Sequence, residues 1–535
     1  MSAEPRPVTS RHAPRRSTGK ASVLVASGIL GSRVLGLLRQ SLMARYLGAG
    51  VASDAFVAAF KIPNLLQNLF GEGALSAAFI PVYARLLAEG DEREADRVAG
   101  AVAAILALAV SVFVLVGVLA APWLIYVVAF GFSGERRDLT IALTRVLFPG
   151  AGLLVLSAWC LGVLNSHRKF LVSYAAPIAW NVAMIVALIV WGRHPDKARV
   201  AVYLAWASVV GSALQLLIQL PVVRRVAPEV RIRLSRSSAH VREVLRNFGP
   251  AFVSRGVVQL SSYIDQFLTS FLPEGMVTVF AYSTTLYNLP VSVFGMAISA
   301  AELPEMARSG VIEGDASAAL RGRLDAGLRR IAFFVVPSAV AFLALGDVLA
   351  RLLFEHGRFT ALDSVYTWGV LCGSAVGLVG GTLGRLYSST YYALRDTRTP
   401  LRFAIMRVAA TTVLGVVGAF VVPRWLGVDP RWGTAGLTAS AGLAAWLEFT
   451  LLRSRMNARI GVTGLTARYT ITLWALAVAA AGIAVMAQGS VMRLGRMTGG
   501  VAVIALYGVA YLGGALLARV PEAQSLLGAV ARRLR

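Results

Sequence analysis

The chain has 535 residues, of which 57% are hydrophobic and only 15% are charged, and its mean hydropathy is +0.68. A soluble domain carries about 25% charged residues, and a soluble chain of this composition would leave apolar surface uncovered. Composition therefore excludes a soluble multidomain enzyme. The net charge of +25 would suggest nucleic acid in a soluble protein, but the basic residues lie mostly in short loops between apolar runs, as in polytopic membrane proteins. We expect no nucleic-acid partner.

The N-terminus and the cysteines narrow the class further. Residues 1–20 are polar and basic, and the apolar stretch that follows contains Arg33 and Arg39. A cleavable signal peptide needs an uncharged apolar core, so we expect a retained cytoplasmic tail. Cys160 and Cys372 each lie inside an apolar run. This placement supports neither a disulfide framework nor a zinc site.

Apolar runs predict the membrane spans. A helix needs about 20 mainly apolar residues to cross a bilayer, and about fourteen such runs follow the tail. They lie near 21–47, 52–80, 98–121, 140–165, 171–192, 200–222, 243–271, 276–301, 331–354, 364–393, 403–422, 433–452, 469–488 and 498–518. An even number returns the C-terminus to the cytoplasm, and the cytoplasmic segments then hold about 33 Lys and Arg against about 10 outside, as the positive-inside rule requires. We predict an all-α polytopic membrane protein.

A weak internal repeat divides the spans into two halves. Ser32-Arg33 recurs as Ser254-Arg255, and Pro81-x-x-Ala84-Arg85 with Glu89-Gly90-Asp91 recurs as Pro304-x-x-Ala307-Arg308 with Glu313-Gly314-Asp315, at separations of 222 to 224 residues. Chance matching in a chain rich in Ala and Arg is the alternative. A separation of six spans gives both copies the same orientation, which is a known transporter plan with the substrate site between the halves.

The repeat and the charges give a domain plan of two pseudo-symmetric six-helix lobes and an added helix pair. Its parts are the tail 1–20, an N-terminal lobe 21–222, a basic cytoplasmic linker 223–242, a C-terminal lobe 243–453, a helix pair 454–520 and a cytoplasmic tail 521–535.

Four cations lie deep inside predicted spans, at Arg33, Arg39, Lys61 and Arg255. Charges at this depth usually face a bundle interior or a hydrated cavity. A phosphate or diphosphate fits such a site, because guanidinium groups present a fork of donors to its oxygens. The alternative is internal pairing with carboxylates. Other arginines lie nearer span ends, where snorkelling to the interface is expected: Arg45, Arg145, Arg351, Arg385 and Arg407.

No enzyme motif occurs in the sequence. It has no Walker loop, no GxSxG and no HExxH, and its five histidines all lie in the tail or in loops. We therefore expect no enzymatic activity and no cofactor. Transport would then be driven by an ion gradient, of Na⁺ or H⁺, or by the substrate itself. Asp265, Asp396 and Thr412, with backbone oxygens, form a candidate site for a monovalent cation; pairing of Asp265 with Arg255 is the alternative.

One long block of sequence is similar to a known family. Ser32-Arg33-Val34-Leu35-Gly36, Arg39, Leu47-Gly48-Ala49-Gly50, Asp54-Ala55-Phe56, Phe60-Lys61-Ile62-Pro63-Asn64-Leu65 and Glu72-Gly73-Ala74 resemble the opening of the MurJ (MviN) family of lipid II flippases. His356-Gly357-Arg358-Phe359-Thr360 and Asp396-x-Arg398-Thr399-Pro400 add to the match. The resemblance implies the fold of the multidrug/oligosaccharidyl-lipid/polysaccharide (MOP) exporters and movement of undecaprenyl-diphosphate-linked disaccharide-pentapeptide to the outer leaflet by alternating access.

The resemblance also assigns roles by position. It implies that Arg33 and Arg39 are cavity arginines, that Asn64 is a polar cavity residue and that Asp54 lies near the outer gate, with a lipid-tail groove in the last two spans. It places the chain in a bacterial cytoplasmic membrane with both termini inside, among membrane lipids and the cell-wall synthesis machinery. Four positions depart from the family pattern, because each has an uncharged residue where the family usually has a charged one: Asn68 and Thr285 in place of arginine, Asn288 in place of glutamate and Gln40 in place of aspartate.

Because of these departures, other functions stay open. A transporter of the same fold for another polyprenyl-linked glycan, such as an O-antigen unit, is one alternative, and a drug exporter is less suited to four deep cations. A membrane scaffold or a polyprenyl-phosphate transferase is an alternative of another class, although the loops lack carboxylates arranged for metal-assisted transfer. Arg255, the repeat counterpart of Arg33, is our candidate to replace the missing basic residues.

Overall fold

The computed structural model describes residues 18–234, 238–309 and 316–534, and every regular element in these ranges is helical. Eleven helical segments in the described part are long and apolar enough to cross a membrane. The other three predicted spans correspond to α1, to α2 with η1 and α3, and to α9, which carry the deep charged residues. Helix α2 has only 16 residues. The all-α polytopic fold class is therefore confirmed, while the count of fourteen spans stays a prediction.

The helices follow one another with short connections. The first half consists of α1 (Thr18–Leu47), α2 (Val51–Leu66), the π-helical η1 (Gln67–Leu75), α3 (Ser76–Glu89), α4 (Glu92–Leu119), α5 (Ala121–Val128), α6 (Gly134–Ser166), α7 (Phe170–Trp191) and α8 (Lys197–Val226). The second half consists of α9 (Ala239–Ser270), α10 (Met276–Pro290), the π-helical η2 (Val291–Met296), α11 (Ala297–Ser309), α12 (Ala316–Leu353), α13 (Ala361–Ala393), α14 (Arg398–Val416), η3 (Val417–Val421), α15 (Val422–Leu426), η4 (Pro430–Trp432) and α16 (Gly433–Ile460). The added elements are α17 (Ala467–Val491), η5 (Met492–Leu494), α18 (Arg496–Leu517) and α19 (Pro521–Leu534).

The internal repeat is visible in the order of the elements. The pairs α1 and α9, α2 and α10, η1 and η2, α3 and α11, and α4 and α12 begin 221 to 225 residues apart. Both copies contain a π-helical segment shortly after a proline, Pro63 or Pro290, that interrupts the regular hydrogen-bonding pattern. The repeated Glu313-Gly314-Asp315 lies outside the described residues. The pseudo-symmetry predicted from short motifs is confirmed at the level of helix order.

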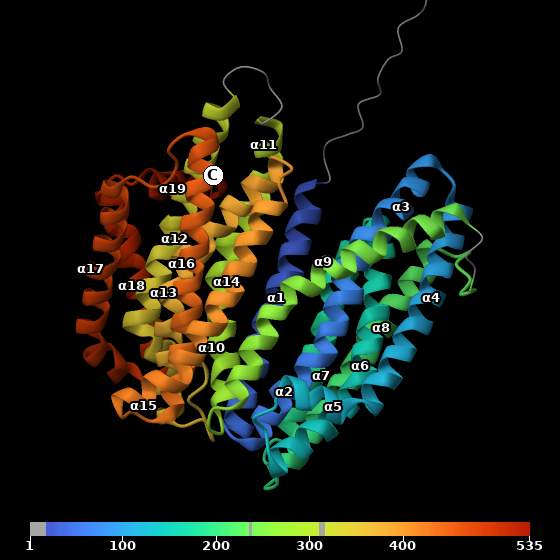
Figure 1. Ribbon diagram of the computed structural model, residues 1–535, viewed down its shortest axis with the longest axis horizontal. Helices are drawn as coiled ribbons and strands as arrows, with labels where there is room; N and C mark the ends of the chain where they lie inside the picture. The colour runs from blue at the N-terminus through green and yellow to red at the C-terminus, as the bar shows by residue number, and fades with distance from the viewer. Residues whose placement is uncertain (1–17, 235–237, 310–315, 535) are drawn as a thin grey trace, which may run out of the picture.

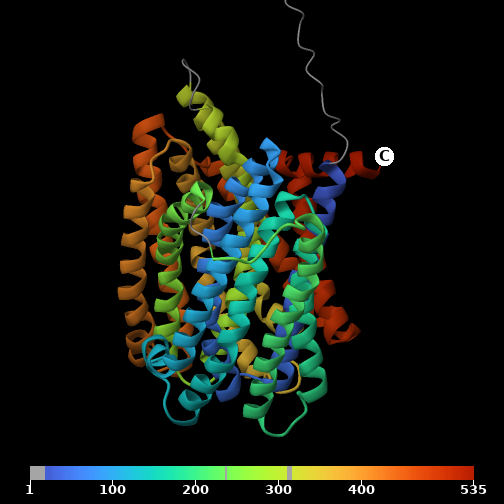
Figure 2. The same cartoon turned by 90° about the vertical axis from the view of Figure 1, so that its right-hand side faces the viewer.

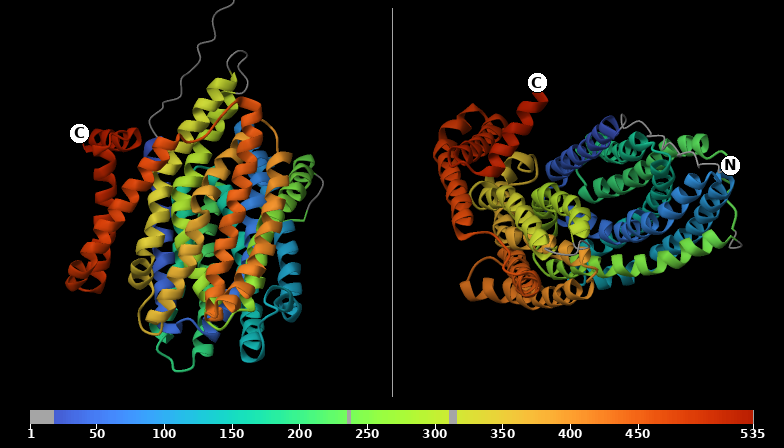
Figure 3. Two further views of the ribbon diagram at one scale, coloured as in Figure 1. Left: turned by 60° about the vertical axis from the view of Figure 1, so that its left-hand side comes forward. Right: turned by 90° about the horizontal axis from the view of Figure 1, so that it is seen from above.

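The two halves meet at one end of the molecule and diverge toward the other (Figure 1). The described chain begins and ends at the divergent end, which we call the open end; the opposite end is the closed end (Figures 1 and 2). Helix α19 lies across the ends of the other helices at the open end, and α17 and α18 flank the second half on its outer side (Figure 3). This arrangement places any space between the halves nearer to the termini.

Helix α9 does not lie wholly with the second half. Its first half is attached to the N-terminal helices by an ion pair of 2.7 Å between Arg85 and Glu243, and by Phe248 and Phe252, whose rings pack on Phe70. Its end reaches the second half, where Leu268 joins a small core with α16 and η3. The first turns of α9 therefore pack on the N-terminal helices, and the lobe boundary predicted at residue 243 stays a prediction.

Candidate functional site

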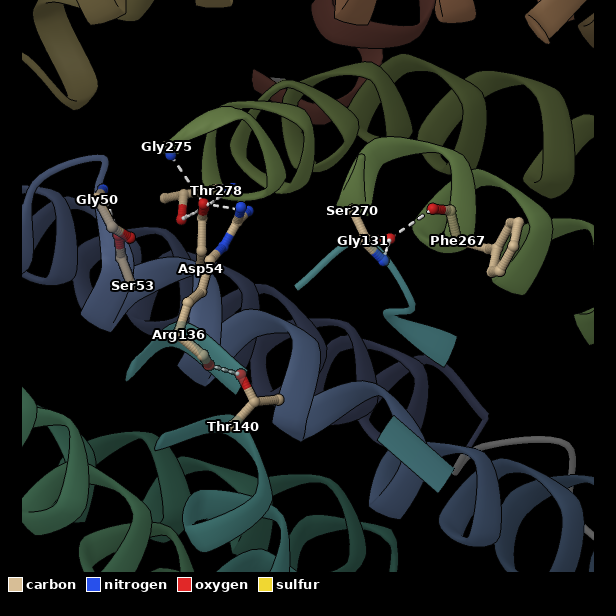
Figure 4. Close-up of polar contacts among 10 residues, drawn as sticks. All are labelled: Gly50, Ser53, Asp54, Gly131, Arg136, Thr140, Phe267, Ser270, Gly275 and Thr278. Atoms are coloured by element: carbon tan, nitrogen blue, oxygen red, sulfur yellow. Dashed lines mark hydrogen bonds and ion pairs between the residues drawn. The ribbon is translucent and has the colours of Figure 1, made fainter. Parts of the chain in front are cut away.

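The closed end is held by one buried carboxylate, that of Asp54 in the first turn of α2. Its side chain is fully buried and accepts hydrogen bonds from the Gly275 amide (2.7 Å) and from the Thr278 amide (2.8 Å) and hydroxyl (2.7 Å) of the opposite half (Figure 4). Arg136 of α6 forms an ion pair with it at 2.6 Å. Asp54 thus connects α2 and α6 of the first half to the start of α10 in the second.

The chemistry of helix ends explains this geometry. Gly275 is the N-cap residue of α10, and the first amides of a helix have no partner within the helix. Asp54 supplies the missing acceptor from another helix, and its negative charge lies at the positive end of the α10 dipole. Gly275 has φ of +87°, and a Cβ there would come within 2.8 Å of the Ala49 carbonyl oxygen. Only glycine allows this close approach.

A second contact strengthens the closed end. The Gly131 amide, in the turn before α6, donates to the Ser270 hydroxyl at the end of α9 at 3.1 Å, and Ser270 in turn donates to the Phe267 carbonyl at 2.7 Å (Figure 4). Apolar residues from both halves form one continuous core around these contacts, including Phe56, Met276 and Tyr282. The closed end therefore combines apolar packing with a few directional polar contacts.

Two further hydrogen bonds join α1 to the α10–η2 segment. The Arg33 guanidinium donates to the Ser292 hydroxyl at 2.7 Å, and the Gln40 amide donates to the Thr285 hydroxyl at 2.9 Å. Arg33 and Gln40 are seven residues apart on α1, or about two turns, and Thr285 and Ser292 are seven residues apart on the α10–η2 segment. The two segments run antiparallel. We call this pairing of α1 with α10 and η2 the side seam. It connects the halves beyond the Asp54 contact, toward the open end.

The predicted cavity residues have different environments. Arg33 is exposed apart from its bond to Ser292. Arg39 is half-buried, with its guanidinium 4.5 Å from the Trp180 ring centre and 3.4 Å from the Met184 sulfur on α7. Its Nε has no hydrogen-bond partner among the described residues. Arg39 is therefore a cation against an apolar, aromatic wall, with unused donor capacity.

The other predicted binding residues belong to α2 and α9. Lys61 and Asp265 lie near enough for their charges to interact, and the Lys61 carbonyl accepts from the Tyr263 hydroxyl at 3.0 Å. Asn64 is half-buried on α2. Arg255 belongs to α9 by its backbone, but its side chain lies outside the described residues. The idea that Arg255 opposes Arg33 therefore stays a prediction.

A cavity of about 320 Å³ lies inside the second half. It is lined by Asp265 at the end of α9, by residues of α10, including Thr284, Tyr287 and Asn288, and by residues of α13, α14 and α16. Two arginines line it as well, Arg385 and Arg407, and Arg407 forms an ion pair of 3.1 Å with Glu448. The sequence predicts that both arginines snorkel at span ends, but the structure places them around this cavity. Only the partner on a neighbouring helix distinguishes the two cases, and the sequence does not show it.

The three-residue cation site is wrong as predicted. Asp396 precedes α14, where it accepts from the Thr399 amide (3.0 Å) and hydroxyl (2.8 Å) and forms an ion pair of 2.7 Å with Arg459. Thr412 lies near the other end of α14, about 20 Å away along the helix axis, and donates to the Val408 carbonyl at 2.9 Å. Asp265 lines the cavity of the second half instead, as does Thr411. In the described part of the chain, no three acidic, His or Cys residues gather as metal ligands.

Comparison with known proteins gives the family. The model of the lipid II flippase MurJ family matches residues 43–504. The chain belongs to the MurJ family. The chain is 34% identical to the lipid II flippase MurJ of Burkholderia cenocepacia over 81% of this chain and 82% of that protein, and 30% identical to the probable lipid II flippase MurJ of Vibrio cholerae over 89% of each.

Solved structures support the same fold. A lipid II flippase MurJ in an inward closed conformation matches with a TM-score of 0.74 at 21% identity, covering 93% of this chain and 99% of that one. An inward-facing multidrug resistance transporter of the MATE family matches with a TM-score of 0.62 at 20% identity, covering 82% of this chain and 98% of that one. The chain thus has the fold of these two transporters, as the resemblance implies.

The MurJ family context gives meaning to two departures from its usual pattern. The resemblance implies an aspartate at the position of Gln40 and a cavity arginine at that of Thr285, and the structure brings these two residues into direct contact. Where the resemblance implies two opposite charges, this chain has a neutral hydrogen bond. The sequence contains both changes, but only the structure shows that the two residues are partners.

Proposed function

We propose that the protein moves lipid II, the undecaprenyl-diphosphate-linked disaccharide-pentapeptide, from the inner to the outer leaflet of a bacterial cytoplasmic membrane. Membership of the MurJ family carries this proposal. The geometry supports it: two pseudo-symmetric halves are joined at the closed end by Asp54 and diverge toward the other end. An alternating-access transporter needs such a pair of halves around a central site.

The proposed orientation places both termini and the open end in the cytoplasm. The excess of Lys and Arg in the segments on that side supports this assignment. In this state the substrate headgroup enters from the cytoplasm, and Arg33, Arg39 and Lys61 provide the positive field for its diphosphate, with Asn64 as a polar contact. Asp54 then acts as the outer gate, because its contacts must break before the closed end can open.

The side seam has a part in this cycle. A lipid-linked substrate keeps its chain in the bilayer while its headgroup enters the protein, so two helices must separate to admit it. Arg33 belongs both to the proposed binding set and to the seam, through its bond to Ser292. We propose that a bound diphosphate competes with Ser292 for the Arg33 guanidinium, so that loading and opening of the seam are coupled.

Depletion of the protein in its own host tests the function directly. The expected result is accumulation of lipid II on the inner leaflet, reversed by the wild-type chain and not by an Arg39→Ala variant of equal abundance. If lipid II is exposed normally while another undecaprenyl-linked glycan accumulates, the alternative of a flippase for that glycan is correct. The neutral Gln40–Thr285 pair, which departs from the family pattern, is the observation that keeps this alternative in the test.

We propose further that Asp265 couples transport to Na⁺ or H⁺. It lines the cavity of the second half, interacts with the charges of Lys61 and Arg407, and has one carboxylate oxygen without a hydrogen-bond partner among the described residues. In proteoliposomes, wild-type flipping should respond to an imposed Na⁺ or pH gradient. Asp265→Asn should remove that response, and a variant that responds like the wild type would exclude the coupling role.

A further inference from the structure

A polar pocket of about 380 Å³ lies at the closed end, separate from Asp54 and from the cavity of the second half. We call it the exit pocket. It is formed where the end of α1, the loop between α12 and α13, and the start of α18 meet. Its polar lining consists of Arg45, Glu355, His356 and Arg496. No role proposed above uses it.

The charges around the exit pocket do not balance. Glu355, with its side chain only 11% exposed, forms ion pairs with Arg496 and, at 3.7 Å, with Arg351. Arg45 is exposed, and among the described residues it has no acidic partner within ion-pair distance. Arg351 also forms an ion pair of 3.9 Å with Asp347, so three arginines have two carboxylates between them, and Arg45 is the one that pairs with neither. Because the pocket lies on the proposed outer side, these arginines are also an exception to the positive-inside rule.

The backbone holds Arg45 in this position. The Arg358 amide donates to the Arg45 carbonyl at 2.9 Å, and Gly357 has φ of +65° with an added Cβ only 2.3 Å from that same carbonyl oxygen. Glycine is therefore required for the loop to contact α1 so closely. The bond uses the backbone of Arg45 and leaves its guanidinium available. Two polar atoms near it, Glu355 Oε2 and His356 Nδ1, also lack hydrogen-bond partners in the described structure.

Arg45 is the third of three evenly spaced arginines on α1. Arg33, Arg39 and Arg45 follow one another at intervals of six residues, or about 9 Å of helix each. They point to different surroundings: Arg33 to η2, Arg39 to α7 and Arg45 to the exit pocket. Helix α1 therefore has arginine side chains along its length, from the proposed diphosphate site at Arg33 and Arg39 to the exit pocket at its end.

We propose that the exit pocket binds the phosphate group of an outer-leaflet lipid, above all the diphosphate of the substrate that has just crossed. This inference rests on the proposed function for its biological meaning. The Arg45 guanidinium, which forms no ion pair within the described residues, matches phosphate oxygens in charge and geometry. The pocket keeps the leaving diphosphate next to a cation while the closed end re-forms, and so disfavours its return.

Binding of farnesyl diphosphate, a water-soluble prenyl diphosphate, tests the proposal with the full chain in phosphatidylcholine nanodiscs. We expect two classes of sites in the wild type. Arg45→Gln should weaken one class by at least about tenfold, as expected for a lost charge-assisted bond, and Arg45→Gln with Arg496→Gln should abolish it. Arg33→Gln with Arg39→Gln should remove the other class. A control with Arg193→Gln in the α7–α8 connection and Arg199→Gln in the first turn of α8 changes the charge equally and should retain both classes.

The variants separate the possible failures. If the pocket variants bind like the wild type, the exit pocket is wrong and the proposed function is unaffected. If the double variant of Arg33 and Arg39 retains both classes of binding sites, the proposed diphosphate site at Arg33 and Arg39 is wrong, and the proposal for the exit pocket is unaffected. The single Arg45→Gln variant breaks no ion pair, and an unchanged melting temperature will show that it folds. Nanodiscs containing phosphatidylglycerol show which phosphate the exit pocket binds. If this anionic lipid displaces farnesyl diphosphate from the pocket, the pocket binds bulk anionic lipid. If farnesyl diphosphate stays bound, the pocket selects the prenyl diphosphate.

Discussion

At the scale of single residues, Asp54 should determine which end of the molecule is closed. Asp54→Ala leaves the buried Arg136 without its ion pair and two amides of α10 without acceptors. Removing one partner of a buried ion pair costs about 3–5 kcal/mol. Here this cost destabilises the state in which the closed end is shut. We expect loss of complementation at normal protein abundance. Asp138→Ala, an exposed carboxylate removed from the same end, is the matched control, and normal growth of the Asp54 variant would exclude a gate.

Asp396 should stabilise the protein in a pH-dependent manner. The Thr399 amide and hydroxyl and the Arg459 guanidinium lower the pKa of the Asp396 carboxyl to about 2, below the value of about 3.9 in an unfolded chain. A lowered pKa gives stability that is complete above about pH 4 and disappears as the pH falls toward 2. At neutral pH we expect Asp396→Asn to cost about 1 kcal/mol, because solvent screens this site. Melting temperatures of the two proteins should converge in acid, and a constant difference would contradict this account.

Residue types alone predicted part of the site. Arg33, Arg39 and Asp54 stand out in the sequence because charges are rare in spans, and all three make contacts within or between the halves. Arg407 and Arg385 could not be assigned in the same way, since arginines near span ends commonly snorkel. Their place depends on which helices surround the cavity. That is a long-range property of the fold which span boundaries do not contain.

At the scale of elements, the side seam between α1 and the α10–η2 segment should open during transport. A short thiol-reactive linker between Gln40→Cys and Thr285→Cys should hold the seam shut and stop flipping, because these side chains are in contact. Cleavage of the linker should restore activity. Each single variant treated in the same way is the control, in a background without Cys160 and Cys372. Undiminished flipping by the linked protein would show that the substrate enters elsewhere.

Two motifs that mark the family have structural explanations at this scale. In His356-Gly357-Arg358-Phe359-Thr360, Gly357 and Arg358 contact the Arg45 carbonyl, and Thr360 caps α13. In Asp396-x-Arg398-Thr399-Pro400, the aspartate binds the first turn of α14. Helix boundaries agreed with the apolar runs to within a few residues at many ends. The attachment of α9 to the first half was missed, because it depends on Phe70 and Glu243, which hydropathy does not distinguish.

At the scale of the whole molecule, α9 connects the two halves and should transmit their motion. Its first half is fixed to η1 and α3, and its end carries Asp265 into the cavity of the second half. A helix of 32 residues is about 48 Å long, so rotation of one half displaces the far end of α9 within the other. Movement of α9 therefore links the ion coupling proposed for Asp265 directly to the relative motion of the two halves.

Alternating access then predicts opposite distance changes at the two ends. Spin labels at Arg97 and Arg323 report on the open end, and labels at Glu135 and Arg424 report on the closed end; all four side chains are exposed. Asp54→Ala removes contacts made only when the closed end is shut, so it should shift the population toward the outward-open state. The first distance should shorten while the second lengthens. Asp138→Ala should leave both distributions as in the wild type. If Asp54→Ala changes only the closed-end distance, the halves do not move as two rigid bodies. Asp54 would then stabilise the closed end locally without affecting the open end.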